Sequence, residues 1–142
     1  MKVNEVMTYG VDFVRPDNTI REAAEKMRDK NEGVIPVFEG SEPVGMVTDR
    51  DIVVRAIAEG REPSSTRVKD VMTPEVFFCM EDMELEEAAQ IMEYKKIRRL
   101  LVKDEKRNII GILSIGDIAT STPKEFTGEV LKEVVGVAYP ER

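Results

Sequence analysis

The sequence predicts an α/β (α+β) fold: two copies of a β-α-β-β-α unit packed about a pseudo-twofold axis, followed by a short C-terminal helix. Three observations predict it. When the chain is shifted by 65 residues, 13 of the 35 positions from Val3 to Val37 are identical. Each copy also shows the same order of apolar patterns. Finally, 42% of the residues are apolar, which is enough to bury a core.

The first copy covers residues 1–59, and each of its elements follows from a local pattern. A capping box, Thr19-x-x-Glu22, predicts where the first helix begins, and apolar residues every three or four positions define its buried face. Two β-prone runs on either side of a turn rich in Gly and Pro predict a hairpin. The predicted order is a strand at 11–14, this helix, a hairpin of strands 34–38 and 44–48 around the turn 39–43, and a second helix at 49–59.

The second copy covers residues 68–121 and follows a polar linker, residues 60–67, that contains Pro and Ser. Residues 122–142 complete the chain, with a last helix expected at 124–137. Its apolar stripe would be Phe126, Val130, Val134 and Val137. The second copy repeats the order of the first: a strand at 76–79, a helix with the apolar face Leu85, Ala88, Ala89 and Met92, a hairpin of strands 99–103 and 109–114, and a helix from 115 to about 121.

The composition argues against several classes of function. The chain has no His and one Cys, so we expect no His-based catalysis, no metal site and no disulfide; Cys79 should be a buried, unreactive thiol. The net charge of −7 argues against binding nucleic acid. No apolar run has the length of a membrane span, and the N-terminus has no signal peptide pattern. We therefore expect a cytoplasmic protein that is not an enzyme and has no catalytic residues.

One motif occurs in both copies, in the segments 45–52 and 111–118, with the pattern Gly-apolar-apolar-[Ser/Thr]-x-x-Asp-Ile. The strand ends and a helix begins at the hydroxyl residue, where unpaired N–H groups favour an anion such as phosphate. The Asp one turn later can accept hydrogen bonds from both hydroxyls of a ribose, and the apolar strand residue two positions before the hydroxyl can wall an adenine. The candidate ligand-binding residues are Met46, Thr48 and Asp51, and Ile112, Ser114 and Asp117.

The same spacing is also the signature of a plain helix cap. Both copies carry Asp, although the longer Glu or Gln closes a capping box best. The residues alone therefore leave both alternatives open: a ligand site, or a cap with no ligand.

Three arginines lie beside the motif: Arg50 is inside its first copy, and Arg98 and Arg99 open the hairpin of the second copy. A guanidinium can bind phosphate through charge-assisted, often bidentate hydrogen bonds. The alternative is an ion pair with one of the 28 acidic residues. The first copy has Gly33 and Val34 where the second has Arg98 and Arg99, so we expect the two sites to differ chemically.

These repeated motifs, together with the opening pattern Val-x-x-Val-Met-Thr, resemble CBS domains, of which a tandem pair is called a Bateman module. The resemblance covers residues 3–121. The segment Thr-Asp-Arg-Asp-Ile-Val also makes the chain similar to stand-alone CBS-pair proteins, a type that includes the bacterial hypoxic response proteins. The resemblance implies a regulatory module that binds AMP, ADP, ATP or S-adenosylmethionine, forms a homodimer, signals to an unidentified protein partner and needs no catalytic cofactor.

The resemblance also implies roles for individual residues. Asp51 and Asp117 would hold ribose hydroxyls, and Thr48 and Ser114 would contact ribose or phosphate. Arg98 and Arg99 occupy the family's basic position, and Arg50 would lie next to the phosphate. Each site would be completed by the opening strand of the other copy, with Thr8 and Val11 at the Asp117 site and Thr73, Val76 and Phe77 at the Asp51 site. The Asp117 site, which has the basic pair, is the stronger candidate.

Three other interpretations stay open. The protein could be a dimerisation or protein-interaction scaffold that binds no ligand, with both motifs acting only as caps. It could be an enzyme, which the absence of a paired nucleophile and base disfavours. It could be an amino-acid-sensing βαββαβ domain, which predicts a final strand where each copy here has a helical pattern.

Overall fold

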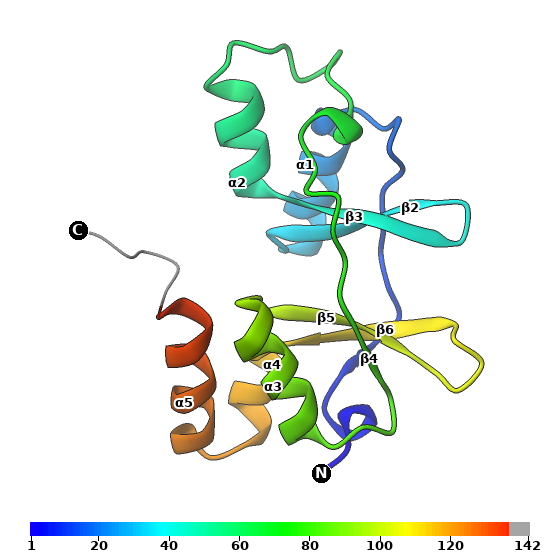
Figure 1. The fold of residues 1–142 in the computed structure, drawn as a ribbon. Helices are drawn as coiled ribbons and strands as arrows, with labels where there is room; N and C mark the ends of the chain where they lie inside the picture. The colour runs from blue at the N-terminus through cyan, green and yellow to red at the C-terminus, as the bar shows by residue number, and fades with distance from the viewer. Residues whose placement is uncertain (137–142) are drawn as a thin grey trace. The chain divides into compact units, whose positions relative to one another are not determined.

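The computed structural model describes residues 1–136, which form two compact units (Figure 1). Unit 2 is Asp12–Val76, and unit 1 combines Met1–Val11 with the described residues from Phe77 onward. The units therefore do not coincide with the sequence copies. The opening segment of each copy packs in the unit that contains the rest of the other copy.

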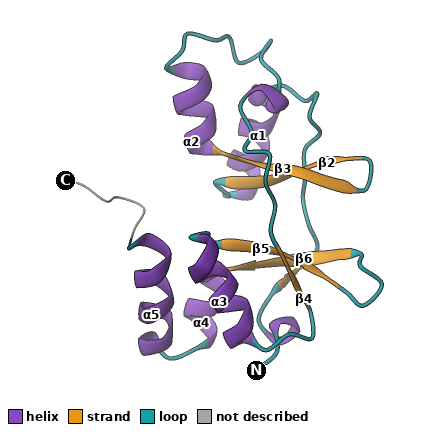
Figure 2. Cartoon of the chain, in the orientation of Figure 1, coloured by secondary structure: helices purple, strands orange, loops and turns teal. Residues whose placement is uncertain are grey.

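Unit 2 contains a hairpin, two helices (Figure 2) and the short 3-10 helix Val68–Asp70. Its buried apolar side chains form one cluster. The fully buried side chains of Ile20, Val37 and Val47 lie in this core. The hairpin strands pair in antiparallel register, and the helix that follows them continues as a π-helical segment. The elements are α1 (Ile20–Lys30), β2 (Val34–Glu39), β3 (Glu42–Thr48), α2 (Asp49–Ile52) and the π-helical Val53–Ile57.

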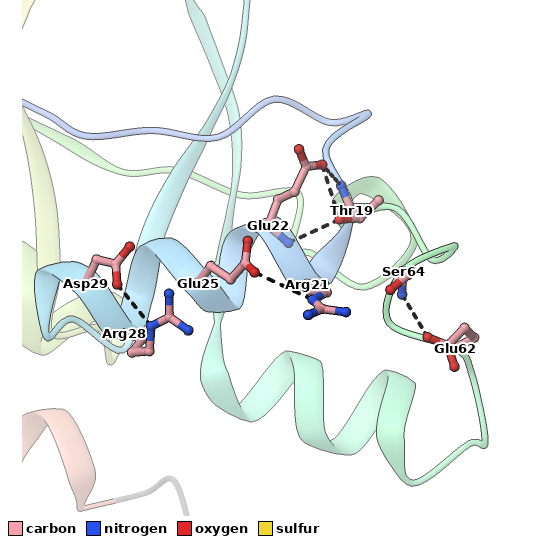
Figure 3. A network of polar contacts seen from close by, with 8 residues as sticks. All are labelled: Thr19, Arg21, Glu22, Glu25, Arg28, Asp29, Glu62 and Ser64. Atoms are coloured by element: carbon pink, nitrogen blue, oxygen red, sulfur yellow. Dashed lines mark hydrogen bonds and ion pairs between the residues drawn. The ribbon is translucent and has the colours of Figure 1, made fainter.

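Helix α1 begins at the predicted capping box (Figure 3). The Glu22 N–H donates to the Thr19 hydroxyl over 3.1 Å, and the Thr19 N–H donates to the Glu22 carboxylate over 2.8 Å. The hydrogen bond from the Thr19 main chain holds the pKa of Glu22 below its usual value. In the same first turns, Arg21 forms an i,i+4 ion pair with Glu25 at 3.5 Å on the exposed side of the helix.

Unit 1 contains a four-stranded sheet in the order β1-β6-β5-β4 and three α-helices. Strands β5 and β6 form the predicted second hairpin, and β4 pairs parallel to β5. Strand β1 comes from the first copy and pairs antiparallel with β6 of the second. The elements are β1 (Thr8–Tyr9), β4 (Phe78–Met80), α3 (Leu85–Lys95), β5 (Arg99–Lys103), β6 (Ile109–Ser114), α4 (Ile115–Ser121) and α5 (Lys124–Val135).

Helix α5 packs against α3 and α4 within unit 1 (Figure 1). Val130 and Val134 are buried in the core of this unit, and Phe126 is partly buried against it. The predicted apolar stripe is confirmed at these three positions, and Val137 lies outside the described residues. No helix within residues 1–136 has the length and apolar character needed to cross a membrane.

Some predicted boundaries are wrong. The first copy's opening strand is not at 11–14: β1 lies at Thr8–Tyr9, and only Val14 of the predicted run forms an isolated bridge, to Val37. Gly10, at φ +87°, interrupts the extended chain after β1. In the second copy, the strand predicted at 76–79 is β4, which begins two residues later and ends one residue later. The first hairpin has a shorter turn than 39–43, because Gly40 adopts φ +64° and the strands continue to Glu39 and Glu42. The helix predicted at 49–59 is α-helical only to Ile52 and π-helical to Ile57.

If α5 belongs to the core, Val130→Ala should lower the free energy of unfolding by about 2 kcal/mol, because it removes two buried methyl groups and leaves a cavity. Leu131 is the matched control, since it follows Val130 on the same helix but is 41% exposed. Leu131→Ala should change the stability by less than about 0.5 kcal/mol. Urea unfolding followed by circular dichroism measures both, and equal losses would contradict this placement of α5.

Burial raises the pKa of the Cys79 thiol to about 12, and its side chain is 2% exposed. A thiol-specific disulfide reagent at pH 8 should therefore label Cys79 only after unfolding. The unfolded thiol ionises near its ordinary pKa of 9.0 while the folded one stays neutral. Stability should consequently fall as the pH rises from about 9 to 12, and this component should be absent in Cys79→Ala. Rapid labelling of the native protein would contradict the prediction.

Candidate functional site

The Ser114–Asp117 motif lies in unit 1, where β6 ends and α4 begins. The Asp117 N–H donates to the Ser114 hydroxyl over 3.1 Å, and the Ser114 N–H donates to Asp117 Oδ2 over 3.0 Å. This reciprocal pair is a complete capping box. It uses one oxygen of the carboxylate. The other oxygen, Oδ1, accepts a longer hydrogen bond of 3.3 Å from the Thr8 hydroxyl.

The Thr48–Asp51 motif repeats this geometry in unit 2. The Asp51 N–H donates to the Thr48 hydroxyl over 2.9 Å, and the Thr48 N–H donates to Asp51 Oδ2 over 3.0 Å. The cap expected from the spacing is therefore present in both copies. In each copy it fixes the Asp side chain while leaving Oδ1 for another partner.

An opening segment passes directly beside each motif. In unit 1, Thr8 pairs with Ile112 in the β1–β6 ladder. In unit 2, Thr73 forms the equivalent bridge with Met46, through main-chain hydrogen bonds of 2.8 and 2.9 Å. The structure thus pairs each threonine with the apolar residue two positions before the hydroxyl of the motif.

The basic pair of the second copy flanks the Ser114 motif. Arg99 lies opposite Ser114 in the β5–β6 ladder, and the Arg98 carbonyl accepts a 2.9 Å hydrogen bond from the Ile115 N–H. Arg98 is exposed and Arg99 is half-buried. Within residues 1–136, neither guanidinium forms a hydrogen bond or an ion pair, and the same holds for the exposed Arg50. These cations are therefore available to an anion.

At the position equivalent to Arg98, unit 2 has the opposite charge nearby. The Gly33 carbonyl accepts the equivalent 2.9 Å main-chain hydrogen bond, from the Asp49 N–H. The Asp49 carboxylate lies over Gly33, where a Cβ atom would come within 2.9 Å of Asp49 Oδ2. A larger residue would have to displace Asp49. The two sites therefore differ in charge at this position, with the Asp49 carboxylate in unit 2 and the Arg98 guanidinium in unit 1.

One residue that the motif analysis missed contacts the Asp51 site. Arg55, one turn after Asp51, places Nε 3.8 Å from Asp51 Oδ1 and donates from Nη1 to the carbonyls of Val71 and Met72 over 3.0 and 3.2 Å. The sequence signal was the i,i+4 spacing of Asp51 and Arg55. Comparing the copies did not reveal it, because the second copy has Ser121 at the equivalent position.

The remaining predicted residues fall into the two units. Val11, Ile112, Met46 and Val76 are half-buried, as side chains lining a base would be. Phe77 lies in unit 1 and packs on its core, with Lys95 Nζ 5.2 Å from the ring centre. Its contribution to the Asp51 site stays a prediction. Among the residues described, no three His, Cys, Asp or Glu side chains are grouped so that they could hold a metal ion.

The CBS domain family matches residues 3–57 and 68–122, which together make up most of the chain. The protein therefore belongs to the CBS domain family, as a tandem pair, and the resemblance seen in the motifs is confirmed. CBS pairs are in general regulatory modules that bind adenosine ligands.

Individual relatives cover nearly the whole chain. The CBS domain-containing protein YhcV of Bacillus subtilis is 41% identical over 133 residues, 93% of this chain and 94% of that one. Hypoxic response protein 1 of Mycobacterium tuberculosis is 28% identical over 131 residues, 92% and 91% of the two chains. Among solved structures, CBSX2 in complex with AMP is similar, with a TM-score of 0.69 and 28% identity over 84% of this chain and 94% of that chain.

The hydroxyl caps should contribute to stability without any ligand. Ser114→Ala should lower the free energy of unfolding by about 1 kcal/mol, because the Asp117 N–H loses its acceptor at the start of α4. Thr120→Ala, a change at an exposed position on the same helix, is the control and should cause no loss. Urea unfolding in nucleotide-free buffer measures both, and an unchanged midpoint for Ser114→Ala would contradict the cap.

Proposed function

We propose that the protein is a regulatory module that binds an adenosyl ligand, such as AMP, ADP, ATP or S-adenosylmethionine, at the Asp117 site. The observation that carries the proposal is the state of the Asp117 carboxylate. Its Oδ2 is held by the cap, while the partner of its Oδ1 among residues 1–136 is the Thr8 hydroxyl, at 3.3 Å. A ribose hydroxyl can replace this long bond and leave the cap intact, because a threonine hydroxyl rotates freely to another partner.

The neighbouring groups fit the rest of such a ligand. Half-buried Ile112 and Val11 offer apolar surface for a base, and Arg98 and Arg99 offer cations for phosphate beside Ser114. The AMP complex of CBSX2, a CBS neighbour that covers most of this chain, supports this class of ligand.

In the proposed mechanism, ligand binding changes the geometry of a homodimer, and a partner protein responds to the change. The ligand can shift such an equilibrium only by its difference in affinity between the two states. The apolar side chains of Val53, Val54 and Ile57, which are 46–56% exposed on the helix after β3, support a homodimer, since a second copy would cover them. No catalytic step and no catalytic cofactor belong to this proposal, and the module would work in the cytoplasm.

The second candidate is a scaffold that dimerises or binds proteins without any ligand. The completed capping boxes favour it, since both motifs already have a structural role in the chain alone. The two candidates differ in whether the Asp side chain does anything beyond the cap.

Thermal unfolding with AMP, ADP, ATP, NADH and S-adenosylmethionine separates the candidates. A ligand at 100 times its Kd adds about 2.7 kcal/mol to the stability of the folded state, which should raise the midpoint by roughly 5–15 °C. The rise should disappear in Asp117→Ala, in which the Ser114 hydroxyl can still cap the main chain of α4. Asp82→Ala, a change of an exposed carboxylate in the same unit, is the control and should keep the rise. No shift with any ligand would favour the scaffold.

A further inference from the structure

Arg55 connects the Asp51 site to the opening segment of the second copy. Its Nη1 donates to the carbonyl oxygens of both Val71 and Met72, and its Nε lies 3.8 Å from Asp51 Oδ1. The Asp51 side chain is 11% exposed and that of Arg55 is 51% exposed. The guanidinium therefore lies beside a nearly buried carboxylate, and two main-chain carbonyls fix its position.

The equivalent oxygen in unit 1 has a different partner. Asp117 Oδ1 accepts from the Thr8 hydroxyl, whereas within residues 1–136 no hydrogen bond joins Asp51 to Thr73, the residue equivalent to Thr8. Arg55 takes the place that a threonine hydroxyl has in the other unit. The second copy cannot form this arrangement, because it has Ser121 at the position equivalent to Arg55.

The backbone of the two helices differs at the same place. Helix α4 stays α-helical from Ile115 to Ser121, but the helix after β3 changes to π-helix over Val53–Ile57, and Arg55 is at the centre of that segment. Such π segments are rare and are frequent at functional sites, since they change the direction of the side chains they carry. The geometry of Arg55 is therefore a local feature of the first copy.

The two partners should differ in how readily they release the carboxylate. A neutral hydroxyl at 3.3 Å yields to a ribose hydroxyl at little cost, because one neutral hydrogen bond replaces another. Releasing Arg55 separates opposite charges beside a carboxylate that is mostly shielded from water, where charge pairs are stronger than on an open surface. The Asp49 carboxylate over Gly33 further disfavours a phosphate at this site.

We propose that Arg55 occupies the Asp51 site from within the chain, so that the protein binds one adenosyl ligand tightly at Asp117 and a second only when Arg55 is released. This inference rests on the proposed function, since it assigns unequal affinities to the two adenosyl sites. Arg55 is the residue that sets the affinity of the second site.

Isothermal titration with adenosine and with AMP tests the proposal. The wild-type protein should bind one tight equivalent per chain, and Arg55→Gln should bind two. In an Asp117→Ala background, which leaves only the Asp51 site, Arg55→Gln should strengthen adenosine binding by about tenfold, corresponding to about 1.4 kcal/mol. Adenosine is the decisive probe because it carries no charge. The loss of the positive charge in Arg55→Gln therefore does not itself change the affinity for adenosine, as it would for AMP.

Arg61→Gln is the matched control, because Arg61 belongs to the same unit and faces a different carboxylate, Asp70, at 3.9 Å. It should leave the stoichiometry and both affinities unchanged. Arg55→Lys provides a second variant if Arg55→Gln does not fold. A lysine cannot reach the two carbonyls and Asp51 together, so it should bind adenosine with intermediate affinity.

Two results would overturn the inference while leaving the proposed function intact. One is two equal sites in the wild-type protein. The other is a single site at Asp117 with no gain in Arg55→Gln. Failure of the wild-type protein and of Arg55→Gln to bind either probe, together with no thermal shift with AMP, ADP, ATP or S-adenosylmethionine, would overturn the proposed function as well, so the two failures are distinguishable.

Discussion

The fold depends on two close main-chain approaches that only glycine permits. A Cβ atom on Gly45 would lie 2.7 Å from the Thr73 carbonyl oxygen, and one on Gly111 would collide with the Thr8 carbonyl and the Met7 side chain. These glycines let the opening segment of each copy lie directly on the last hairpin strand of the other copy. The segments then add their own side chains to the cores, including Val3 and Met7 in unit 1 and Val68 and Val71 in unit 2. Without this approach, each unit would lose part of its core.

The same contact positions the candidate sites. Each hairpin strand that carries the glycine ends at a hydroxyl residue, and the cap that begins there holds an Asp by one carboxylate oxygen. The opening segment brings a threonine beside that Asp. A structural cap and a ligand site are therefore not exclusive, because a carboxylate has two oxygens and the cap uses one. In the proposed function, the same Asp would both stabilise the fold through the cap and hold a ribose, which is why binding is read from the ligand-dependent shift in the unfolding midpoint and not from stability alone.

The sequence predicted what is encoded locally. The hairpin of Arg99–Lys103 and Ile109–Ser114 and the helix Ile115–Ser121 have the predicted boundaries, since alternation and capping act over a few residues. The strand at 11–14 was wrong, because a short β-prone run forms a strand only where a partner lies beside it. The exchange of opening segments came from the family resemblance, since pairing Thr8 with Ile112 joins residues 104 apart in the sequence and no local pattern encodes it. Arg55 was missed because a comparison of the two copies reveals only the residues that they share, and the second copy has Ser121 at this position.

Apart from the π-helical segment Val53–Ile57, the differences between the two candidate sites lie in their side chains. The main-chain hydrogen bonds from Asp49 to Gly33 and from Ile115 to Arg98 have the same length of 2.9 Å, yet these pairs of residues carry opposite charges. Around Asp51, the two cations Arg50 and Arg55 are balanced by Asp49 and Asp51 itself. Around Asp117, Arg98 and Arg99 outnumber the single carboxylate of the motif. An anionic ligand therefore meets a net positive charge in one unit and a neutral group in the other, so that a duplicated fold can carry two sites of different affinity.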